Sequence, residues 1–506
     1  MHRLIIALLA GSLAGCSCGD DPPAPGAMDA SGVSAAPSPF ITDRVLEVRV
    51  ELEPAAWAQM MASPEEEAYQ HANLVFDGTR LENIAVRTKG NSSLGSVKRM
   101  GSHRFSFKLD LDEYVDGQEL MGVDKLVFDN GFKDPTLLRE ALAYEIARSF
   151  GLEAPRTAFV DLWMAGEHLG LYTLVEVVGK EFLERSFADD GGDLYKLEPQ
   201  AGFLGWMGTT IAGYSGLEVE RNEDTTDHAA FLRLVEVLHS GAADQYDGVL
   251  DVQAVLRYLA FDSALVNLDS YLGMGHNYYL YEQADRFSVI PWDLNEAFGN
   301  FTCGCSREGL IGLYIDEPTC GATSGYPLLQ RLFAVPANLE RYHGYLQELV
   351  DGPLQETRFG ATVDALADLV RPYVLADTTK FFSNEDFERG LSQDVGSSVI
   401  GLRAFASERG AAIRAQMEGR SPATNGGRGS CGGGPRPCPP NCSDAGAPSP
   451  CGDGVCDSVE QRDPRLCPRD CADAGMPSPC GDGVCDSVEQ RDPRLCPRDC
   501  ADAGTR

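Results

Sequence analysis

Residues 267–295 read NLDSYLGMGHNYYLYEQADRFSVIPWDLN and form the densest group of polar side chains in the chain. Asp269 directly follows a long apolar segment that has the composition of a helix. Two short aromatic and β-branched segments on either side of a polar turn predict a β-hairpin over residues 278–290. Asp293 lies just past the end of that hairpin. The order along the chain is therefore Asp, Asn277, hairpin and Asp.

Protein kinases use side chains in the same order. One Asp orients the accepting hydroxyl, an Asn holds Mg²⁺, and an Asp after a short hairpin holds Mg²⁺ between the phosphates. The chemistry needs placement and charge neutralisation, because its transition state resembles metaphosphate. However, Asp269 and Asn277 are further apart than in protein kinases, and the sequence has no His-Arg-Asp, Asp-Phe-Gly or glycine-rich phosphate motif. The pattern alone leaves open that these side chains only cap helices and turns.

The sequence before this stretch is mainly that of β-strands. Residues 45–52 alternate between apolar and polar side chains, and residues 160–175 predict a second hairpin. Residues 104–111 alternate strictly, and this places four apolar side chains on one face: Phe105, Phe107, Leu109 and Leu111. Asp134 as N-cap and Pro135 as the first helical residue predict a helix that ends at Gly151.

The sequence from Phe231 onward is mainly that of helices, the clearest of which are residues 256–268 and 328–350. Strands and one helix followed by a helical half predict an α+β fold. No His shows metal-ligand spacing, and His276 is expected to be a loop residue. No G-x-S-x-G motif indicates a hydrolase.

Six motifs in the same order resemble the CotH family of atypical protein kinases, and the resemblance covers residues 40–410. They are residues 88–93 (TKGNSS), 138–144 (LREALAY), 166–176 (GEHLGLYTLVE), 192–196 (GDLYK), 277–281 (NYYLY) and 290–293 (IPWD). The resemblance implies a two-lobed, protein-kinase-like α+β domain. It also implies an enzyme that uses ATP and Mg²⁺ to phosphorylate Ser or Thr of exported or surface proteins.

For catalysis and metal binding, the resemblance implies that Asp269 is the catalytic Asp and Asp293 the main Mg²⁺ ligand. Asn277 and Asn295 are further candidate ligands. Many family members carry Asp where Asn295 stands, and an amide oxygen ligates Mg²⁺ without contributing charge. This departure leaves open a catalytically inactive member that acts as a binding or structural lipoprotein. Transfer of AMP instead of phosphate is a further alternative.

For nucleotide binding, the resemblance implies that Lys108 neutralises phosphates and that Glu140 holds this lysine. Tyr172 and Trp292 are candidates for stacking on adenine, and Glu176 is a further candidate for cofactor binding. The alternatives are a solvated strand lysine for Lys108 and a surface helix residue for Glu140.

The N-terminus resembles that of a bacterial lipoprotein. A basic start and a short apolar run precede Leu13-Ala14-Gly15-Cys16, in which Cys16 would be lipidated. The run is too short to span a membrane, and an ordinary signal peptide remains the alternative. Residues 1–16 are thus predicted as a signal peptide, 17–39 as a flexible tether, 40–419 as the kinase-like domain and 420–450 as a linker.

The C-terminus predicts two small repeats stapled by disulfides, residues 451–475 and 480–504. Cys451 through Cys471 recurs as Cys480 through Cys500, with four cysteines in each unit. Units this small need disulfides to fold, and export permits them. Asp453, Asp457 and Glu460 could ligate Ca²⁺, whereas a plain disulfide knot or zinc are the alternatives. Upstream, Cys303, Cys305 and Cys320 predict one local disulfide with one cysteine left over.

The charge balance limits the partners. Lys and Arg number 42 and Asp and Glu number 76, for a net charge of −34. Nucleic-acid phosphates would be repelled, so nucleic acid is excluded as a partner. The expected partners are exported protein substrates, with membrane contact through the lipid anchor only. The expected location is the cell envelope, at the outer membrane or cell surface and outside the cytoplasm.

Overall fold

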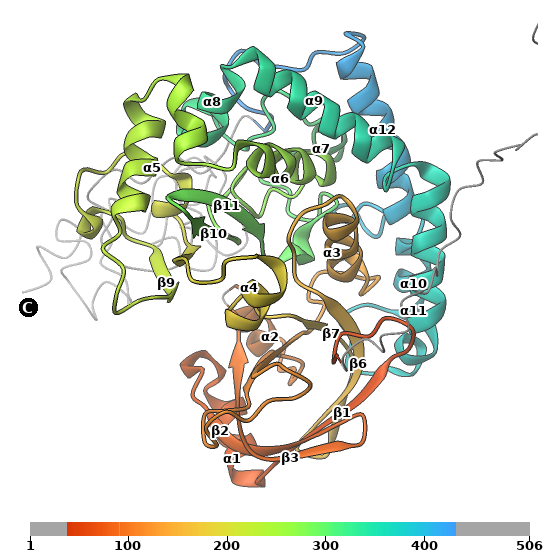
Figure 1. The fold of residues 1–506 in the computed structure, drawn as a ribbon. Helices are drawn as coiled ribbons and strands as arrows, with labels where there is room; N and C mark the ends of the chain where they lie inside the picture. Colours follow the sequence, from red (N-terminus) through yellow and green to blue (C-terminus); the bar gives the residue numbers. More distant parts are fainter. Residues whose placement is uncertain (1–37, 91, 432–506) are drawn as a thin grey trace, which may run out of the picture.

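A closed barrel of seven strands forms the first lobe (Figure 1). The computed structural model describes residues 38–90 and 92–431. The strand order is β1-β2-β3-β4-β5-β7-β6, and β1 closes the barrel by pairing in parallel with β6. The strands are β1 (Leu46–Leu52), β2 (Gln70–Phe76), β3 (Thr79–Lys89), β4 (Ser106–Asp110), β5 (Lys125–Asp129), β6 (Thr157–Met164) and β7 (Glu167–Val175).

The predicted alternation of residues 104–111 is confirmed. Phe105, Phe107, Leu109 and Leu111 all pack inside the barrel. On the neighbouring strand β5, Val127 faces the other way and belongs to the core of the second lobe. The outer face of β3, β4 and β5 therefore turns toward the helical lobe.

Four α-helices accompany the barrel strands in the described residues: α1 (Pro54–Ala62), α2 (Ser92–Arg99), α3 (Arg139–Ser149) and α4 (Lys180–Ser186). Helix α3 ends beside Gly151 as predicted, but it begins at Arg139 and not at Pro135. The carboxylate of Asp134 accepts the backbone N–H groups of Thr136 and Arg139, at 2.8 Å each. It thereby caps a turn that precedes the helix.

The second lobe places a four-stranded sheet among helices. The sheet order is β11-β10-β8-β9, with β8 (Leu194–Leu197), β9 (Leu217–Arg221), β10 (Tyr278–Gln283) and β11 (Arg286–Pro291). The helices are α5 (Ala229–Ser240), α6 (Val252–Leu265), α7 (Arg307–Ile311), α8 (Pro327–Phe333), α9 (Pro336–Asp351), α10 (Glu356–Ala376), α11 (Asn384–Gly390) and α12 (Leu402–Met417). The predicted hairpin is confirmed as β10–β11, and the α+β fold is confirmed.

The helix predicted over residues 328–350 is two helices, α8 and α9. Pro336 has no N–H to donate to a preceding turn, so it starts a new helix at its first position. Among the described helices, none combines the length and the apolar composition that crossing a membrane requires.

The packed part of the domain continues past its predicted end at Gly419. Residues 420–431 lie against the loop that precedes α8, where Glu317 accepts the N–H of Gly427 at 2.8 Å and Ser430 donates to the Glu317 carbonyl at 2.8 Å. The start of the predicted linker is therefore part of the domain. The predicted signal peptide with Cys16, most of the predicted tether, and both cysteine-rich repeats with their Ca²⁺ candidates lie outside the described residues.

The cysteines near the second lobe form two disulfides, Cys303–Cys320 and Cys305–Cys431. The predicted local disulfide is confirmed. The sequence prediction did not say which cysteine is left over; it is Cys305, which pairs with Cys431 from the predicted linker. Residue Cys431 thereby ties the end of the described chain to the segment that follows β11.

Candidate active site

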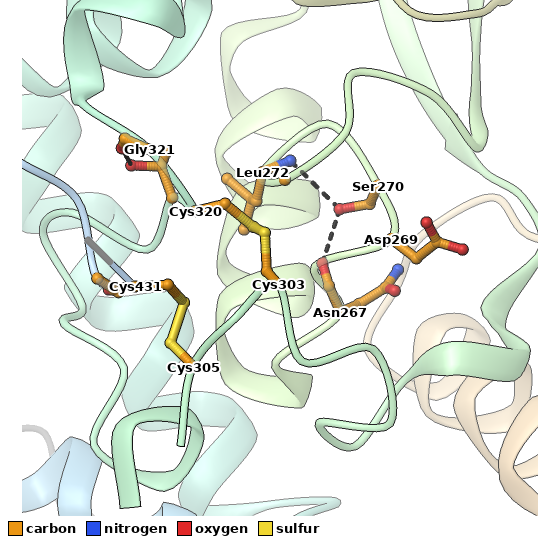
Figure 2. Close-up of a disulfide and its surroundings, with 12 residues drawn as sticks. Asn267, Asp269, Ser270, Leu272, Cys303, Cys305, Cys320, Gly321 and Cys431 are labelled. Carbon is orange, nitrogen blue, oxygen red and sulfur yellow. Dashed lines mark hydrogen bonds between the residues drawn. A yellow bond between two sulfur atoms is a disulfide. The ribbon is translucent and has the colours of Figure 1, made fainter. Parts of the chain in front are cut away.

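A tight loop after α6 carries Asp269. Helix α6 ends at Leu265, and Val266 adopts a left-handed conformation with φ of 48°. Within the loop, Asn267 donates its backbone N–H to the Asp262 carbonyl (2.9 Å) and its side-chain amide to the Asp262 carboxylate (3.0 Å). The Ser270 hydroxyl donates to the Asn267 carbonyl at 2.7 Å (Figure 2). These buried contacts fix the backbone on both sides of Asp269.

The Asp269 side chain is 20% exposed, and His276 and Asn277 form hydrogen bonds with this residue. His276 Nε2 lies 2.8 Å from its Oδ1. The Asn277 side-chain amide donates to the Asp269 carbonyl at 2.9 Å and, less closely, to Oδ2 at 3.3 Å. Oδ2 thus has room to accept a hydrogen bond from a substrate hydroxyl.

Asp293 follows β11 and lies near Lys89 and Asp129 of the barrel. Its backbone is left-handed, with φ of 52°, and its N–H donates to the Tyr144 hydroxyl of α3 at 3.0 Å. Its Oδ1 is buried and has no hydrogen-bond partner in the described residues. Burial is the main cause that raises the pKa of Asp293 to about 7; the Lys89 charge opposes the rise, and the carboxylates of Asp129 and Asp269 contribute to it.

A lysine and two carboxylates from three elements complete this cluster. Lys89, at the end of β3, lies 2.9 Å from Asp129 at the end of β5. Burial lowers the pKa of Lys89, but the carboxylates of Asp129, Asp293 and Glu140 outweigh it and raise that pKa. Burial and the same neighbouring carboxylates, Asp129 and Asp293, raise the pKa of Glu140 well above its usual value. The cluster therefore holds more negative charge than Lys89 can neutralise.

This excess of carboxylate fits a divalent cation. The buried oxygens Asp293 Oδ1 and Glu140 Oε1 have no hydrogen-bond partner in the described residues. Across residues 38–90 and 92–431, no three His, Cys, Asp or Glu side chains converge as a preformed metal site. Mg²⁺ usually takes one or two carboxylates and fills its remaining positions with phosphate oxygens and water. The donor set around Asp293 matches that mode of binding.

The structure places the other candidate metal ligands at two different positions. Asn295, in the 3₁₀ turn Leu294–Glu296, is half-buried and makes no hydrogen bond to another described residue, so its amide oxygen is free to act. The Asn277 amide nitrogen is already engaged in holding Asp269. Asn277 therefore supports the loop through its amide nitrogen, and its amide oxygen as a metal ligand stays a prediction.

Of the candidate nucleotide residues, Trp292 lies at the site. Its indole ring is 5.8 Å from Lys89 Nζ and meets Tyr279 edge-to-face. Glu140 also lies in the cluster, as expected. The lysine near it is Lys89, however, and not Lys108.

Lys108 lies on the same outer face of the barrel, opposite Arg87 in the pairing of β3 with β4. It forms no ion pair with another described residue, and burial together with the nearby Arg87 guanidinium lowers its pKa. The sequence assignment of the Glu140 partner is corrected accordingly. The two lysines share one face, and only Lys89 stands at the strand end that reaches α3.

Tyr172 and Glu176 are not brought to the cluster. Tyr172 is 1% exposed inside the barrel and its hydroxyl donates to the Phe105 carbonyl at 3.0 Å, so neither ring face is open to adenine. Glu176 is 1% exposed, and its carboxylate accepts hydrogen bonds from Arg156 at 2.6 Å and Arg185 at 3.0 Å. Both residues therefore support the barrel and its exit strand.

Sequence reasoning missed Lys89, Asp129, His276 and Tyr144. Lys89 lies inside the TKGNSS motif, and Tyr144 is one helical turn after Glu140, so that both had a local signal. Asp129 and His276 had none, because only the barrel pairing and the folding of the loop bring them to the site.

Two comparisons with known proteins show what this chain is similar to. Over 301 residues the chain is 24% identical to the inner spore coat protein H of Bacillus subtilis (strain 168). This alignment covers 57% of this chain and 80% of that protein. Residues 86–413 match the family described as CotH kinase protein. That match spans well over half of the chain and includes the whole cluster from Lys89 to Asn295, and the protein therefore belongs to the CotH kinase family.

Proposed function

We propose that this protein transfers the γ-phosphoryl group of ATP, with Mg²⁺, to a Ser or Thr hydroxyl of exported proteins. The observation that carries the proposal is the meeting of Asp269 with the carboxylate-rich cluster around Asp293. One group is placed to orient an acceptor, and the other is placed to hold a cation. Membership of the CotH kinase family supports the same reading.

Each side chain then has a distinct task. Asp269 Oδ2 accepts the hydrogen bond of the acceptor hydroxyl and aims its oxygen at the phosphorus. Asp293, with Glu140 and Asn295 nearby, would hold the metal, which neutralises charge on the phosphates when bound. Lys89 adds a positive charge from β3, and Trp292 offers a ring face at the wall of the site.

The proposed location follows from the N-terminus. We propose that Cys16 is lipidated and anchors the domain to the outer membrane or cell surface. The similarity to an inner spore coat protein supports a surface-associated role.

The test uses the purified chain with Mg²⁺ and ATP labelled at the γ or the α position. Transfer of γ-label alone supports a kinase, transfer of α-label indicates AMP transfer, and no transfer favours a binding protein. Asp293→Ala should abolish Mg²⁺-dependent ATP binding and label transfer while the circular dichroism spectrum and melting temperature change little. Full transfer by folded Asp293→Ala would contradict the assignment of this site.

A further inference from the structure

His276 lies between two carboxylates beside the candidate acceptor site. Its Nε2 is 2.8 Å from Asp269 Oδ1, and its Nδ1 is 3.8 Å from Glu198 Oε2. The His276 side chain is 21% exposed, so most of its surface is buried by surrounding residues. The ring therefore connects Asp269 with the strand pair β8–β9 on its other side.

The far side of the ring is itself fixed. Glu198 follows β8 and is 3.0 Å from Lys196 Nζ, which is 2.9 Å from Glu218 of β9. This places a row of alternating charges, from Glu218 to Asp269, along one edge of the site. Neither Glu198 nor the ring can turn away without breaking an ion pair.

The backbone that carries His276 is fixed as well. Gly202 packs so closely on the loop that a Cβ there would lie 1.7 Å from the Gly275 carbonyl oxygen. Tyr278, just after the loop, donates its hydroxyl to the Gly202 carbonyl at 2.6 Å. The His276 ring is therefore held by its own backbone as well as by Glu198.

We propose that His276 is a positioning residue that fixes the Asp269 carboxylate for the phosphoryl transfer proposed above, on which this inference rests. Its Nε2–H occupies Oδ1 and leaves Oδ2 as the oxygen that meets the acceptor. Without this contact the carboxylate rotates about its Cβ–Cγ bond, and the acceptor is no longer held in line. Misplacement of a reacting group by about 1 Å lowers turnover on the order of 10²-fold.

A purely structural role is the alternative, and the molecule contains a matched pair for comparison. His343 lies on helix α9, outside the site. Its Nε2 is 2.6 Å from Asp316 Oδ1. The two histidines have similar exposure, 21% and 30%. A change at His343 therefore measures what the loss of such a contact costs the fold alone.

Two substitutions by neutral amides test the contacts of the two ring nitrogens separately. Gln at position 276 places its amide nitrogen near the site of Nε2 and preserves a donor to Asp269. Asn places its amide near Nδ1 and preserves only the contact toward Glu198. We expect His276→Asn to lower kcat for release of γ-label from ATP by roughly 10- to 100-fold, with the KM for ATP within about twofold. His276→Gln should recover most of kcat.

The controls complete the experiment with the full chain, ATP and Mg²⁺. His343→Asn should leave both kcat and KM unchanged. In the Asp269→Asn background, His276→Asn should have little further effect, because both changes disable the same group. Equal loss in His276→Gln and His276→Asn, additive effects in the double variant, or unchanged kcat in His276→Asn would each overturn the proposal. A wild-type chain that releases no γ-label would instead overturn the proposed function, and the inference with it.

Discussion

Two lysines lie on one face of the barrel and have different surroundings. Lys108 opposes Arg87 across β3 and β4, and Lys89 lies two residues beyond Arg87, so that all three side chains share one face. Strict alternation predicted this face correctly for Lys108. Alternation does not show which lysine lies beside α3, because that depends on the tertiary packing of α3 against the ends of the strands.

The two lysines can be compared by the same substitution. Lys89→Met removes the lysine that pairs with Asp129 and lies near Glu140 and Asp293, so turnover should fall on the order of 10²-fold or more. Lys108→Met removes a charge without an ion-pair partner in the described residues, and turnover should change less than about threefold. Kinetics of γ-label release from ATP in both variants check this. A larger loss in Lys108→Met would restore the sequence assignment.

Asp262, under the Asp269 loop, is fully buried and no cation pairs with it in the described residues. Burial raises its pKa to about 7 from a usual value of 3.8, although the hydrogen bond from the Asn267 amide and the nearby hydroxyls of Ser270 and Tyr258 oppose this rise. A carboxyl group with a raised folded-state pKa stabilises the fold when protonated. That contribution is complete below about pH 4 and is lost as the pH rises to about 7.

Asp262→Asn should therefore flatten the dependence of stability on pH. Between pH 4 and 7, the wild type should lose up to about 1.4 kcal/mol of unfolding free energy per pH unit relative to the variant. Urea unfolding of both proteins at several pH values measures the difference. Parallel curves would mean that Asp262 does not change its protonation in this range.

At the scale of elements, local patterns predicted the hairpins well and the ends of helices less well. The β10–β11 hairpin and the strand over residues 104–111 follow directly from alternation and turn residues. The sequence predicted Asp134 as a helix cap. Its carboxylate does accept backbone N–H groups, as a helix cap does, but these belong to the turn that precedes α3 and to the first residue of that helix. Closure of the barrel rests on the parallel pairing of β1 with β6, which no local pattern indicates.

The two disulfides lie at different distances from the Asp269 loop along the fold. Cys320 donates its N–H to the Leu272 carbonyl at 3.1 Å, and a Cβ at Gly273 would lie 2.7 Å from its Sγ, so the Cys303–Cys320 bridge packs against the Asp269 loop (Figure 2). The Cys305–Cys431 bridge joins residues 126 positions apart and holds the end of the domain.

Loss of the two bridges should therefore have different effects. Paired Ser substitution at Cys305 and Cys431 should cost about 4–5 kcal/mol of unfolding free energy, but leave turnover near the wild-type value. Ser at Cys303 and Cys320 should cost less stability, about 3 kcal/mol for its shorter loop, and should also lower turnover. Denaturant unfolding and label-release kinetics on each double variant check both effects. Equal turnover in the two variants would contradict the link to the Asp269 loop.

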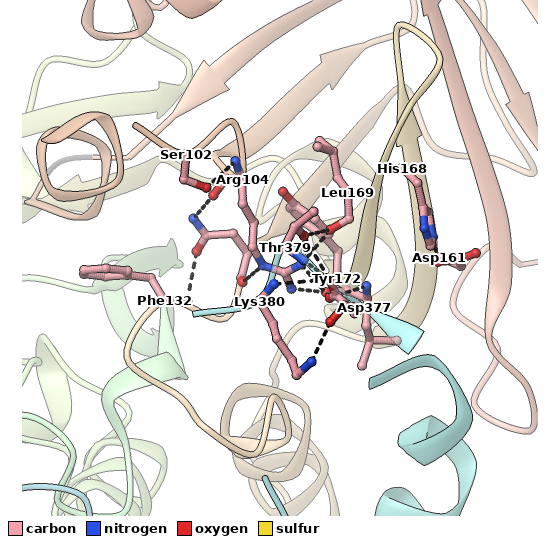
Figure 3. A network of polar contacts seen from close by, with 12 residues as sticks. Ser102, Arg104, Phe132, Asp161, His168, Leu169, Tyr172, Asp377, Thr379 and Lys380 are labelled. Carbon is pink, nitrogen blue, oxygen red and sulfur yellow. Dashed lines mark hydrogen bonds and ion pairs between the residues drawn. The ribbon is translucent and has the colours of Figure 1, made fainter. Parts of the chain in front are cut away.

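At the scale of the whole molecule, a segment after α10 fastens the helical lobe to the barrel (Figure 3). Arg104 and Asp377 are both fully buried, and their ion pair is 2.7 Å long. Arg104 also donates to the carbonyl of Leu169 at 2.6 Å and of Asn130 at 3.0 Å. Such a pair is strongly coupled to the fold, because removing one partner leaves an unpaired buried charge. We call this ion pair the clamp, because it joins the segment after α10 to the barrel.

The absence of a side chain at Gly170 makes room for the Asp377 carboxylate beside Arg104. It has a φ of +81°, and a Cβ there would lie 2.1 Å from Asp377 Cγ. Gly166, at the turn of the same hairpin, has a φ of +84° with no atom within 4 Å of its Cβ position. Gly166→Ala therefore measures backbone strain alone, about 1 kcal/mol. Gly170→Ala adds displacement of Asp377 from Arg104, for a total of at least about 4 kcal/mol, and should lower turnover by loosening the lobes. Denaturant unfolding of both variants tests this, since equal losses would show that the clamp does not hold the lobes together.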